Sequence, residues 1–359
     1  MKVGVVGAGI SGLSIAFHLL ERGASVTVLE RKGVGAGASG IQPGGVRRQW
    51  STRANCLMAS ESYAFYREFP ERFATRATAR FDPCGYLFLA DDERTLAGFA
   101  AAVELQNELG IPSRLLTPAE AAAVVPGLDP AGLAGGATCA EDGYFDRPQA
   151  VVEAFAELVT ARGGRIEIGG VHAIRSDGEG WRLDDHGFDA VAVAAGAESR
   201  ALLAPLGFDL PIVDEPRTLF LGEPVRERLL EPLVIAVDRG IAAKQLADGR
   251  VLASDLHTAS RARLRAELDR LLPVLQYVAL PIDATGYYDM TPDGRPIVDR
   301  LDDGLWVAAG FSGHGFMVAP STGSAVADGL LGLELPEWHE TVRADRFGAA
   351  EAAAETQVI

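Results

Sequence analysis

Residues 3–30 read VGVVGAGISGLSIAFHLLERGASVTVLE, and this stretch decides the fold. The apolar run Val3–Val6 predicts a short buried strand, and the glycine-rich GAGISG at 7–12 predicts a tight turn after it. Leu13–Glu21 has helical character, and Val26–Leu29 predicts a second strand. A strand, a turn, a helix and a strand in this order indicate a unit of two parallel strands joined by a helix.

The turn has the GxGxxG spacing of a dinucleotide-binding motif. Gly7 permits the turn, Gly9 lets the backbone approach a pyrophosphate, and Gly12 lets helix and strand pack closely. The start of the helix then faces the phosphates. Glu30, which ends the second strand, suits ribose hydroxyls and would repel a 2′-phosphate, so FAD or NAD is favoured over NADP. A chance glycine-rich turn is the competing interpretation.

Composition predicts a globular protein with neither a nucleic acid nor an anionic membrane as its main partner. Apolar residues make up 48% of the 359 residues, and 33 Lys plus Arg stand against 49 Asp plus Glu, a net charge of −16. Three separated cysteines without a CxxC pair predict neither a disulfide framework nor a zinc ribbon. The run Val3–Leu20 is nearly uncharged, but His18 and four glycines argue against a signal peptide or a membrane span. We expect a soluble, cytoplasmic protein.

The remaining chain predicts alternating helices and strands, with two excursions from the first unit. Helices are expected at 51–71, 96–109, 147–162, 259–272 and 319–331. Strands are expected at 85–90, 164–168, 171–174, 189–196, 233–237, 250–253 and 305–309. The loop 33–45 holds six glycines around Ser39, and it either lies against a flat ligand or is a plain surface loop. The Ala- and Glu-rich tail is expected to be frayed.

Five segments in fixed order carry a resemblance to a known family. They are GAGISG with Glu30, GASG at 37–40, AVAAGAES at 192–199, TPDGRPIVD at 291–299 and GFSGHGFMVAPSTG at 310–323. From residue 1 to about 332 the chain resembles the D-amino-acid oxidase superfamily of flavoproteins, within it the group of glycine oxidase, sarcosine oxidase and the proline dehydrogenase β-subunit. The resemblance implies an α/β fold in which a Rossmann-like FAD-binding domain is interleaved with an α+β substrate domain built on an antiparallel sheet.

The resemblance also implies domain boundaries. The FAD-binding domain is expected to be discontinuous, at 1–47, 145–215 and 285–345. The substrate-binding domain is expected at 48–144 and 216–284, followed by a C-terminal tail at 346–359.

The implied cofactor is noncovalent FAD, because the cysteine that binds flavin covalently in monomeric sarcosine oxidases falls near Gly286. The loop 310–316 can place backbone N–H groups and a positive helix end against the flavin, which is anionic when reduced; an ordinary turn between strand and helix is the alternative. The expected FAD contacts are Gly7, Gly9, Ile10, Ser11, Gly12, Glu30, Arg31, Ser39, Gly40, Gly45, Val171, Ala195, Gly196, Gly313, His314, Gly315, Phe316 and Met317.

A substrate carboxylate needs a cation, and Arg47 and Arg48 directly follow the glycine loop. The run VRRQW at 46–50 resembles the segment that carries the carboxylate-binding arginine in sarcosine oxidases and proline dehydrogenase β-subunits, and Arg47 aligns best. A structural salt bridge is the alternative for Arg47, and Arg48 could point to solvent. The expected catalytic residues are Arg47, Arg48, Tyr288 and His314, and the expected substrate contacts are Arg47, Trp50, His257, Tyr287, Tyr288 and Met317.

Several of these assignments have alternatives. His314 is expected to shape the flavin loop more than to act as a base, and His257 and Tyr287 could serve only in packing. Met317 stands at the position of a lysine in monomeric sarcosine oxidases. Glycine oxidase has an arginine near the sequence position of Tyr288. The oxygen-activating lysine of sarcosine oxidases falls near Ala253, so the electron acceptor is either oxygen or a protein partner.

The sequence therefore predicts an FAD-dependent amine oxidase or dehydrogenase. Its substrate would be an N-substituted glycine or a small amino acid, oxidised at the C–N bond by hydride transfer to flavin N5. The alternatives are a flavin subunit of a proline-like dehydrogenase complex and a 2-hydroxy acid dehydrogenase.

Overall fold

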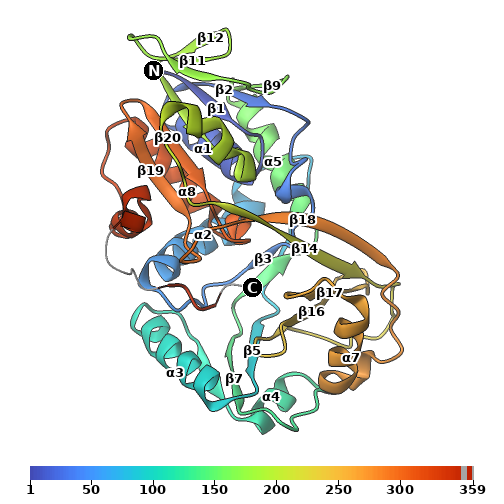
Figure 1. The fold of residues 1–359 in the computed structure, drawn as a ribbon. Coiled ribbons are helices and arrows are strands. Elements are labelled where there is room, and N and C mark those ends of the chain that lie inside the picture. The colour runs from blue at the N-terminus through green and yellow to red at the C-terminus, as the bar shows by residue number, and fades with distance from the viewer. Residues whose placement is uncertain (349–353, 358–359) are drawn as a thin grey trace.

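The computed structural model describes residues 1–348 and 354–357. The described residues form a six-stranded and an eight-stranded sheet. In Figure 1 the first lies in the upper part of the molecule and the second in the lower part, and its long strands β14 and β18 lie between the two. Eight α-helices and six short 3-10 helices are found in the described residues.

The six-stranded sheet has the order β19-β20-β13-β1-β2-β9, and only the β19–β20 pair is antiparallel. Its strands are β1 (Lys2–Val6), β2 (Ser25–Glu30), β9 (Arg165–Ile168), β13 (Ala190–Val193), β19 (Ile297–Asp302) and β20 (Leu305–Ala309). Helices α1 (Ile10–Glu21), α5 (Pro148–Ala161) and α8 (Gly315–Leu330) cover one face. The small sheet of β10 (Ile174–Ser176), β11 (Trp181–Leu183) and β12 (His186–Phe188) covers the other.

The eight-stranded sheet has the order β18-β14-β17-β16-β15-β5-β7-β6, and only the β15–β5 pair is parallel. Its strands are β5 (Tyr86–Ala90), β6 (Arg114–Leu116), β7 (Gly135–Cys139), β14 (Val213–Leu221), β15 (Leu233–Ala236), β16 (Ile241–Gln245), β17 (Val251–Asp255) and β18 (Ile282–Met290). Helices α4 (Pro118–Val124) and α7 (Arg261–Leu271) pack on one face.

Shorter elements connect these layers. The helices are α2 (Arg53–Arg72), α3 (Glu93–Glu108) and α6 (Ser199–Leu203). A third small sheet contains β3 (Gly45–Val46), β8 (Gly143–Phe145) and β4 (Phe81–Asp82). The 3-10 helices are η1 (Ala38–Gly40), η2 (Gly196–Glu198), η3 (Ala204–Leu206), η4 (Pro273–Leu275), η5 (Glu337–Val342) and η6 (Ala344–Gly348).

The predicted strand–helix–strand unit is present, since β1, α1 and β2 follow one another and β1 pairs with β2 in parallel. The strand expected at 171–174 is wrong: β10 begins only at Ile174 and belongs to the small antiparallel sheet. The sheets draw their strands from alternating segments of the chain, and β14 and β18 extend across the expected boundaries at 215/216 and 284/285. The division into two domains stays a prediction.

Helix α8 begins at Gly315, four residues before the start expected from the sequence. Pro320 lies inside the helix and has no N–H to donate to the carbonyl of Phe316. The Tyr66 hydroxyl donates to that carbonyl at 2.6 Å instead, and its ring stacks on Phe316. A donor from α2 therefore lets the helix continue through a proline that usually marks its first turn.

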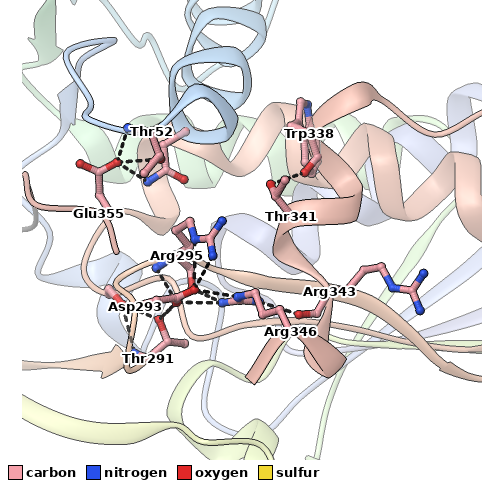
Figure 2. Close-up of polar contacts among 11 residues, drawn as sticks. Thr52, Thr291, Asp293, Arg295, Trp338, Thr341, Arg343, Arg346 and Glu355 are labelled. Carbon is pink, nitrogen blue, oxygen red and sulfur yellow. Dashed lines mark hydrogen bonds and ion pairs between the residues drawn. The ribbon is translucent and has the colours of Figure 1, made fainter. Parts of the chain in front are cut away.

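The C-terminal tail is not frayed where the structure describes it. Arg346, in η6, forms an ion pair with Asp293 at 2.8 Å, and Asp293 also pairs with Arg295. The Glu355 side chain is buried against the start of α2, as Figure 2 shows beside Thr52. The expectation failed because the tail is stabilised by distant partners that its own composition does not reveal; residues 349–353 and 358–359 lie outside the described part.

No helix within residues 1–348 and 354–357 combines the length and the apolar character that a bilayer crossing requires.

Helices α1 and α8 pack so closely that a glycine is needed at their contact. A Cβ placed on Gly323 would lie 2.2 Å from Ser14 Oγ and 2.7 Å from the Ser14 carbonyl carbon. Gly98, in α3, is exposed and has nothing within 4 Å of the same position. Both glycines lie in the middle of a helix, but only Gly323 lacks room for a side chain.

We predict that Gly323→Ala destabilises the protein by about 1–3 kcal/mol, because the added methyl group overpacks the contact. Gly98→Ala should stabilise it by about 0.5–1 kcal/mol through helix propensity. Urea unfolding of both variants measures the two free energies. Equal effects would contradict the close packing of α1 on α8.

Candidate active site

The glycine turn after β1 brings backbone very close to backbone. A Cβ on Gly12 would lie 2.0 Å from the Gly7 carbonyl oxygen, and Gly7 has φ +104°. Only glycine fits these two positions. The backbone N–H groups of Ser11 and Gly12, at the start of α1, donate to no atom of the described residues. This turn therefore presents free donors at the positive end of a helix.

Glu30 and Ser39 lie beside this turn. The Glu30 carboxylate accepts hydrogen bonds from the N–H of Ala8 at 2.8 Å and of Lys32 at 2.7 Å. Ser39, in the glycine loop, accepts from the Ile10 N–H at 3.0 Å. Both predicted cofactor contacts are thus placed against the start of α1, where a ribose and a phosphate of a dinucleotide would lie.

Three other predicted cofactor contacts, Arg31, Ala195 and Gly196, lie at one edge of the six-stranded sheet. Strands β1, β2, β13 and β20 are parallel, so their carboxyl ends meet at the same edge. Arg31 follows β2 and pairs with Glu198, and Ala195 and Gly196 follow β13. Val171 packs in the same apolar cluster as Ala195.

A second helix begins at this edge after β20. Gly313 and His314 precede α8, and the N–H groups of Gly315 and Phe316 have no acceptor in the described residues. Two helices therefore direct free N–H groups toward the carboxyl edge of the sheet. Such helix ends favour anionic groups.

Arg47 lies fully buried between the two halves of the molecule. Its guanidinium carbon lies 3.7 Å from the Trp50 ring centroid and 5.1 Å from that of Phe88. One terminal nitrogen, Nη1, donates to the Gln49 carbonyl, and Nη2 donates to the Gln357 carbonyl. No carboxylate of the described residues lies within 4.0 Å of this guanidinium, so the cation is buried without a charged partner.

His314 lies on the other side of the same guanidinium. Its Nε2 is 3.4 Å from Arg47 Nη2, and its ring meets Trp50 edge-on at 4.5 Å. Burial, together with the charge of Arg47, lowers the pKa of His314 well below its ordinary value. Burial also lowers the pKa of Arg47 to about 10, which leaves it charged at neutral pH. The pair is thus a cation beside a neutral imidazole.

Arg48 has a different role from Arg47. Its Nε lies 3.1 Å from the buried Asp142 carboxylate, and its Nη2 lies 2.7 Å from Glu141. The guanidinium also covers the Tyr63 ring at 3.9 Å. Arg48 therefore neither points to solvent nor offers a free charge, and the expectation that it takes part in catalysis is not supported by its contacts.

Tyr288 forms part of the wall around this cluster. A Cβ placed on Gly313 would lie 2.2 Å from the edge of the Tyr288 ring. Strand β18 therefore packs directly on the loop before α8. Arg217 lies over the same ring at 5.4 Å. Tyr287 is 58% exposed because neighbouring residues of a strand point to opposite faces.

Two further expected residues lie elsewhere. His257 is exposed in the turn after β17, and its ring packs on Gly240. Ala253 packs with Phe220 in the apolar cluster that includes α4 and α7. Tyr86 and Phe88 belong to a different apolar cluster. Neither His257 nor Ala253 therefore packs with the residues of the Arg47 cluster, and Tyr287 is exposed.

Sequence reasoning missed Lys244 and Tyr86. Lys244 is 2% exposed; its Nζ donates to the Pro43 carbonyl at 2.5 Å and lies 3.6 Å from the Tyr144 ring centroid. Burial lowers the pKa of Lys244 to about 7. A lone lysine within the apolar run IAAKQ at 241–245 was the available signal.

Tyr86 and Met317 meet at Gly45. A Cβ on Gly45 would lie 1.9 Å from the Tyr86 hydroxyl and 3.9 Å from the Met317 methyl group. Gly40 is equally restricted, because its Cβ would lie 2.6 Å from the Gly35 carbonyl oxygen. Gly40 and Gly45 are therefore closely packed, whereas Gly33 and Gly37 of the same loop have nothing within 4 Å of the Cβ position.

Comparison with known proteins agrees with this geometry. Residues 2–329 match the model of the DAO family, described as FAD dependent oxidoreductase. The chain belongs to this family. The resemblance, the α/β fold class, the oxidoreductase activity and FAD as cofactor are thereby confirmed.

Three similar proteins illustrate the range of the family. A glycine oxidase from Geobacillus kaustophilus is 27% identical over 91% of this chain and 92% of its own length. The sarcosine oxidase subunit beta of Rhodobacter capsulatus is 24% identical over 90% of this chain and 83% of its own. The crystal structure of L-proline dehydrogenase from P. horikoshii covers 97% of both chains with a TM-score of 0.89 and 27% identity.

The residues present fit FAD. The glycine turn with its free N–H groups at Ser11 and Gly12 would hold the pyrophosphate, and Glu30 would hold the ribose. The start of α8 would face the flavin ring, where its positive end favours the reduced, anionic form. We expect noncovalent binding, since Gly286 stands near the position of the flavin-linking cysteine.

A substitution at Gly9 can test cofactor binding without changing the packing of the fold. A Cβ at Gly9 would meet only Ser39 Oγ, at 3.2 Å, so the fold itself has room for a side chain there. We predict that Gly9→Val keeps the unfolding temperature of the flavin-free protein but loses FAD, because the side chain intrudes on the pyrophosphate. Flavin absorbance per chain measures the loss.

Gly33→Val is the control, because Gly33 lies in the loop after β2 and a Cβ placed on it has nothing within 4 Å. It should keep its flavin. A yellow Gly9→Val protein would contradict the assignment of the motif.

Proposed function

We propose that the protein oxidises the C–N bond of an N-substituted glycine or another small amino acid with a free carboxylate. The observation that supports this substrate class is the buried Arg47 guanidinium, which has no carboxylate within 4.0 Å among residues 1–348 and 354–357. A buried cation is costly unless it is paired, and a substrate carboxylate would supply the missing charge. The names of the glycine oxidase and sarcosine oxidase relatives are in keeping with this class.

The residues of the cluster would bind and orient the substrate. Trp50 and Phe88 cover the faces of the Arg47 guanidinium and keep water from it, which strengthens its attraction for a carboxylate. Tyr288 would close the other side and offer a hydroxyl as a second donor. His314 stays neutral beside Arg47 and so orients the guanidinium without competing for the anion.

The bound FAD would supply the oxidant, accepting a hydride from the substrate Cα at flavin N5 while the amine lone pair assists. The imine product hydrolyses, and an N-carboxymethyl substrate would give glyoxylate and the freed amine. Oxygen as final acceptor would yield hydrogen peroxide. No residue of the chain is needed as a base, because the neutral amine carries the electron pair that drives the hydride out.

A second candidate is the flavin subunit of a multi-subunit dehydrogenase. It is favoured by the similarity to L-proline dehydrogenase and to a sarcosine oxidase subunit beta. A 2-hydroxy acid dehydrogenase is less well supported, because it would need a base and the Nε2 of His314 faces the Arg47 cation.

The test is anaerobic bleaching of the flavin at about 450 nm, followed by readmission of air. Glycine, sarcosine, proline, longer N-carboxymethyl amino acids and 2-hydroxy acids form the panel. We expect bleaching by amines, with rapid return of colour for an oxidase and slow return for a dehydrogenase subunit. Bleaching by hydroxy acids alone would overturn the proposal.

We predict that Arg47→Ala raises KM for the carboxylate substrate by about tenfold to 150-fold, since a charge-assisted hydrogen bond contributes about 1.5–3 kcal/mol. FAD should stay bound. Arg76→Ala, which changes an arginine that is 94% exposed, is the control and should leave KM unaltered. Unchanged kinetics in Arg47→Ala would remove Arg47 from the substrate site.

A further inference from the structure

Residues Ala354–Gln357, here called the C-terminal segment, lie against the start of α2. Glu355 is 5% exposed. Its carboxylate accepts hydrogen bonds of 2.5–3.2 Å from Ser51 N, Ser51 Oγ, Thr52 N, Thr52 Oγ1 and Asn55 Nδ2. Figure 2 shows this contact beside Thr52.

This contact has a clear physical basis. Thr52 is the residue that caps α2, yet its side chain makes no capping bond within its own helix. The Glu355 carboxylate supplies that acceptor from far along the chain, and an anion is favoured at a helix start. The Glu355 N–H also donates to the Asp293 carbonyl at 2.9 Å, and Asp293 is fixed by Arg295 and Arg346. Glu355 therefore anchors the segment at two points.

From this anchor the segment reaches Arg47. The Gln357 carbonyl accepts a hydrogen bond from Arg47 Nη2, and the same nitrogen lies 3.4 Å from His314 Nε2. Nη2 thus donates to the Gln357 carbonyl and has the His314 ring beside it. Nη1 donates to the Gln49 carbonyl, and Nε donates to no atom of the described residues.

The donor pattern of Arg47 conflicts with binding a carboxylate. A guanidinium binds a carboxylate through two parallel N–H groups, either Nε with Nη2 or Nη1 with Nη2. Both forks include Nη2. The Gln357 carbonyl occupies one of the two Nη2 hydrogens and so blocks one of the two forks, and the His314 ring crowds the same nitrogen at 3.4 Å.

We propose that the C-terminal segment is a displaceable plug of the carboxylate site. The Gln357 carbonyl holds Arg47 in the absence of substrate, and a substrate carboxylate replaces it because a charged acceptor binds a guanidinium more strongly than a neutral one. Glu355 is a positioning residue that acts through the segment it anchors. The proposal rests on the proposed function only in taking Arg47 as the carboxylate ligand.

The plug has a measurable consequence. The apparent affinity of a ligand is reduced by the fraction of molecules whose site is open, so releasing the plug lowers both KM and the dissociation constant of a carboxylate. A segment closed nine-tenths of the time corresponds to a change of about tenfold. A merely structural contact would leave KM unchanged or raise it.

The experiment uses the flavin-loaded full chain and acetate, a carboxylate without an amine. In Glu355→Ala we expect the acetate dissociation constant from calorimetry and KM for the amine substrate to fall about tenfold, with kcat unaltered. Glu355→Gln, which keeps the shape and loses the charge, should give a smaller fall. Glu337→Gln is the control, because Glu337 is an exposed carboxylate that pairs with Arg53 on the same helix start, and it should leave both constants unchanged.

Hydrogen exchange of the wild-type protein gives a second readout that needs no variant. Saturating acetate should speed amide exchange in residues 354–357. Exchange that acetate leaves unaltered, or a KM that rises or stays constant in both Glu355 variants, would overturn the plug. Arg47→Ala separates the two hypotheses: if it weakens acetate binding while Glu355→Ala does not change it, the plug alone fails, and if it has no effect on acetate binding, the assignment of Arg47 fails as well.

Discussion

The close contact of α1 with the turn before it and with α8 is the constraint on which the rest of the molecule depends. Gly12 lets α1 start against the Gly7 carbonyl, and Gly323 lets α8 lie directly on Ser14. Because β1 and β20 run in the same direction, both helices begin at one edge of the sheet. Their free N–H groups therefore point to one region, which becomes a site for an anionic cofactor.

Charge is distributed around this region in a consistent way. Two helix starts and the Arg47 guanidinium are positive, whereas His314 is kept neutral by burial and by the charge of Arg47. Arg48, one residue away, is neutralised by Asp142 and Glu141. Arg47, the cation that we propose for a ligand, thus has no carboxylate partner in the described residues, whereas Arg48 is paired, although the two arginines are chemically identical.

The C-terminal segment connects the site to parts of the chain with no part in the chemistry. Asp293 belongs to the TPDGRPIVD segment and pairs with Arg295 and Arg346. Its carbonyl accepts the hydrogen bond from the Glu355 N–H. Glu355 in turn caps α2, the helix whose Tyr66 completes the hydrogen bonding of α8. Helix α2 therefore contacts both α8 and the segment that reaches Arg47.

The sequence by itself determined the dinucleotide motif, the order of β1, α1 and β2, the family and Arg47 as a candidate ligand. The motif and the order of the first elements depend on glycine spacing and apolar periodicity, whereas the family and Arg47 follow from segments that resemble those of known flavoproteins; all of these signals are local in the sequence. It did not determine that Arg48 is paired, that Tyr287 points outward, that α8 continues through Pro320 or that Glu355 is buried. Each of those depends on a partner such as Asp142, Tyr66 or Thr52 that lies far away in the sequence. Only the tertiary structure brings such partners together, because the free energy of a buried polar group is set by its neighbours in space.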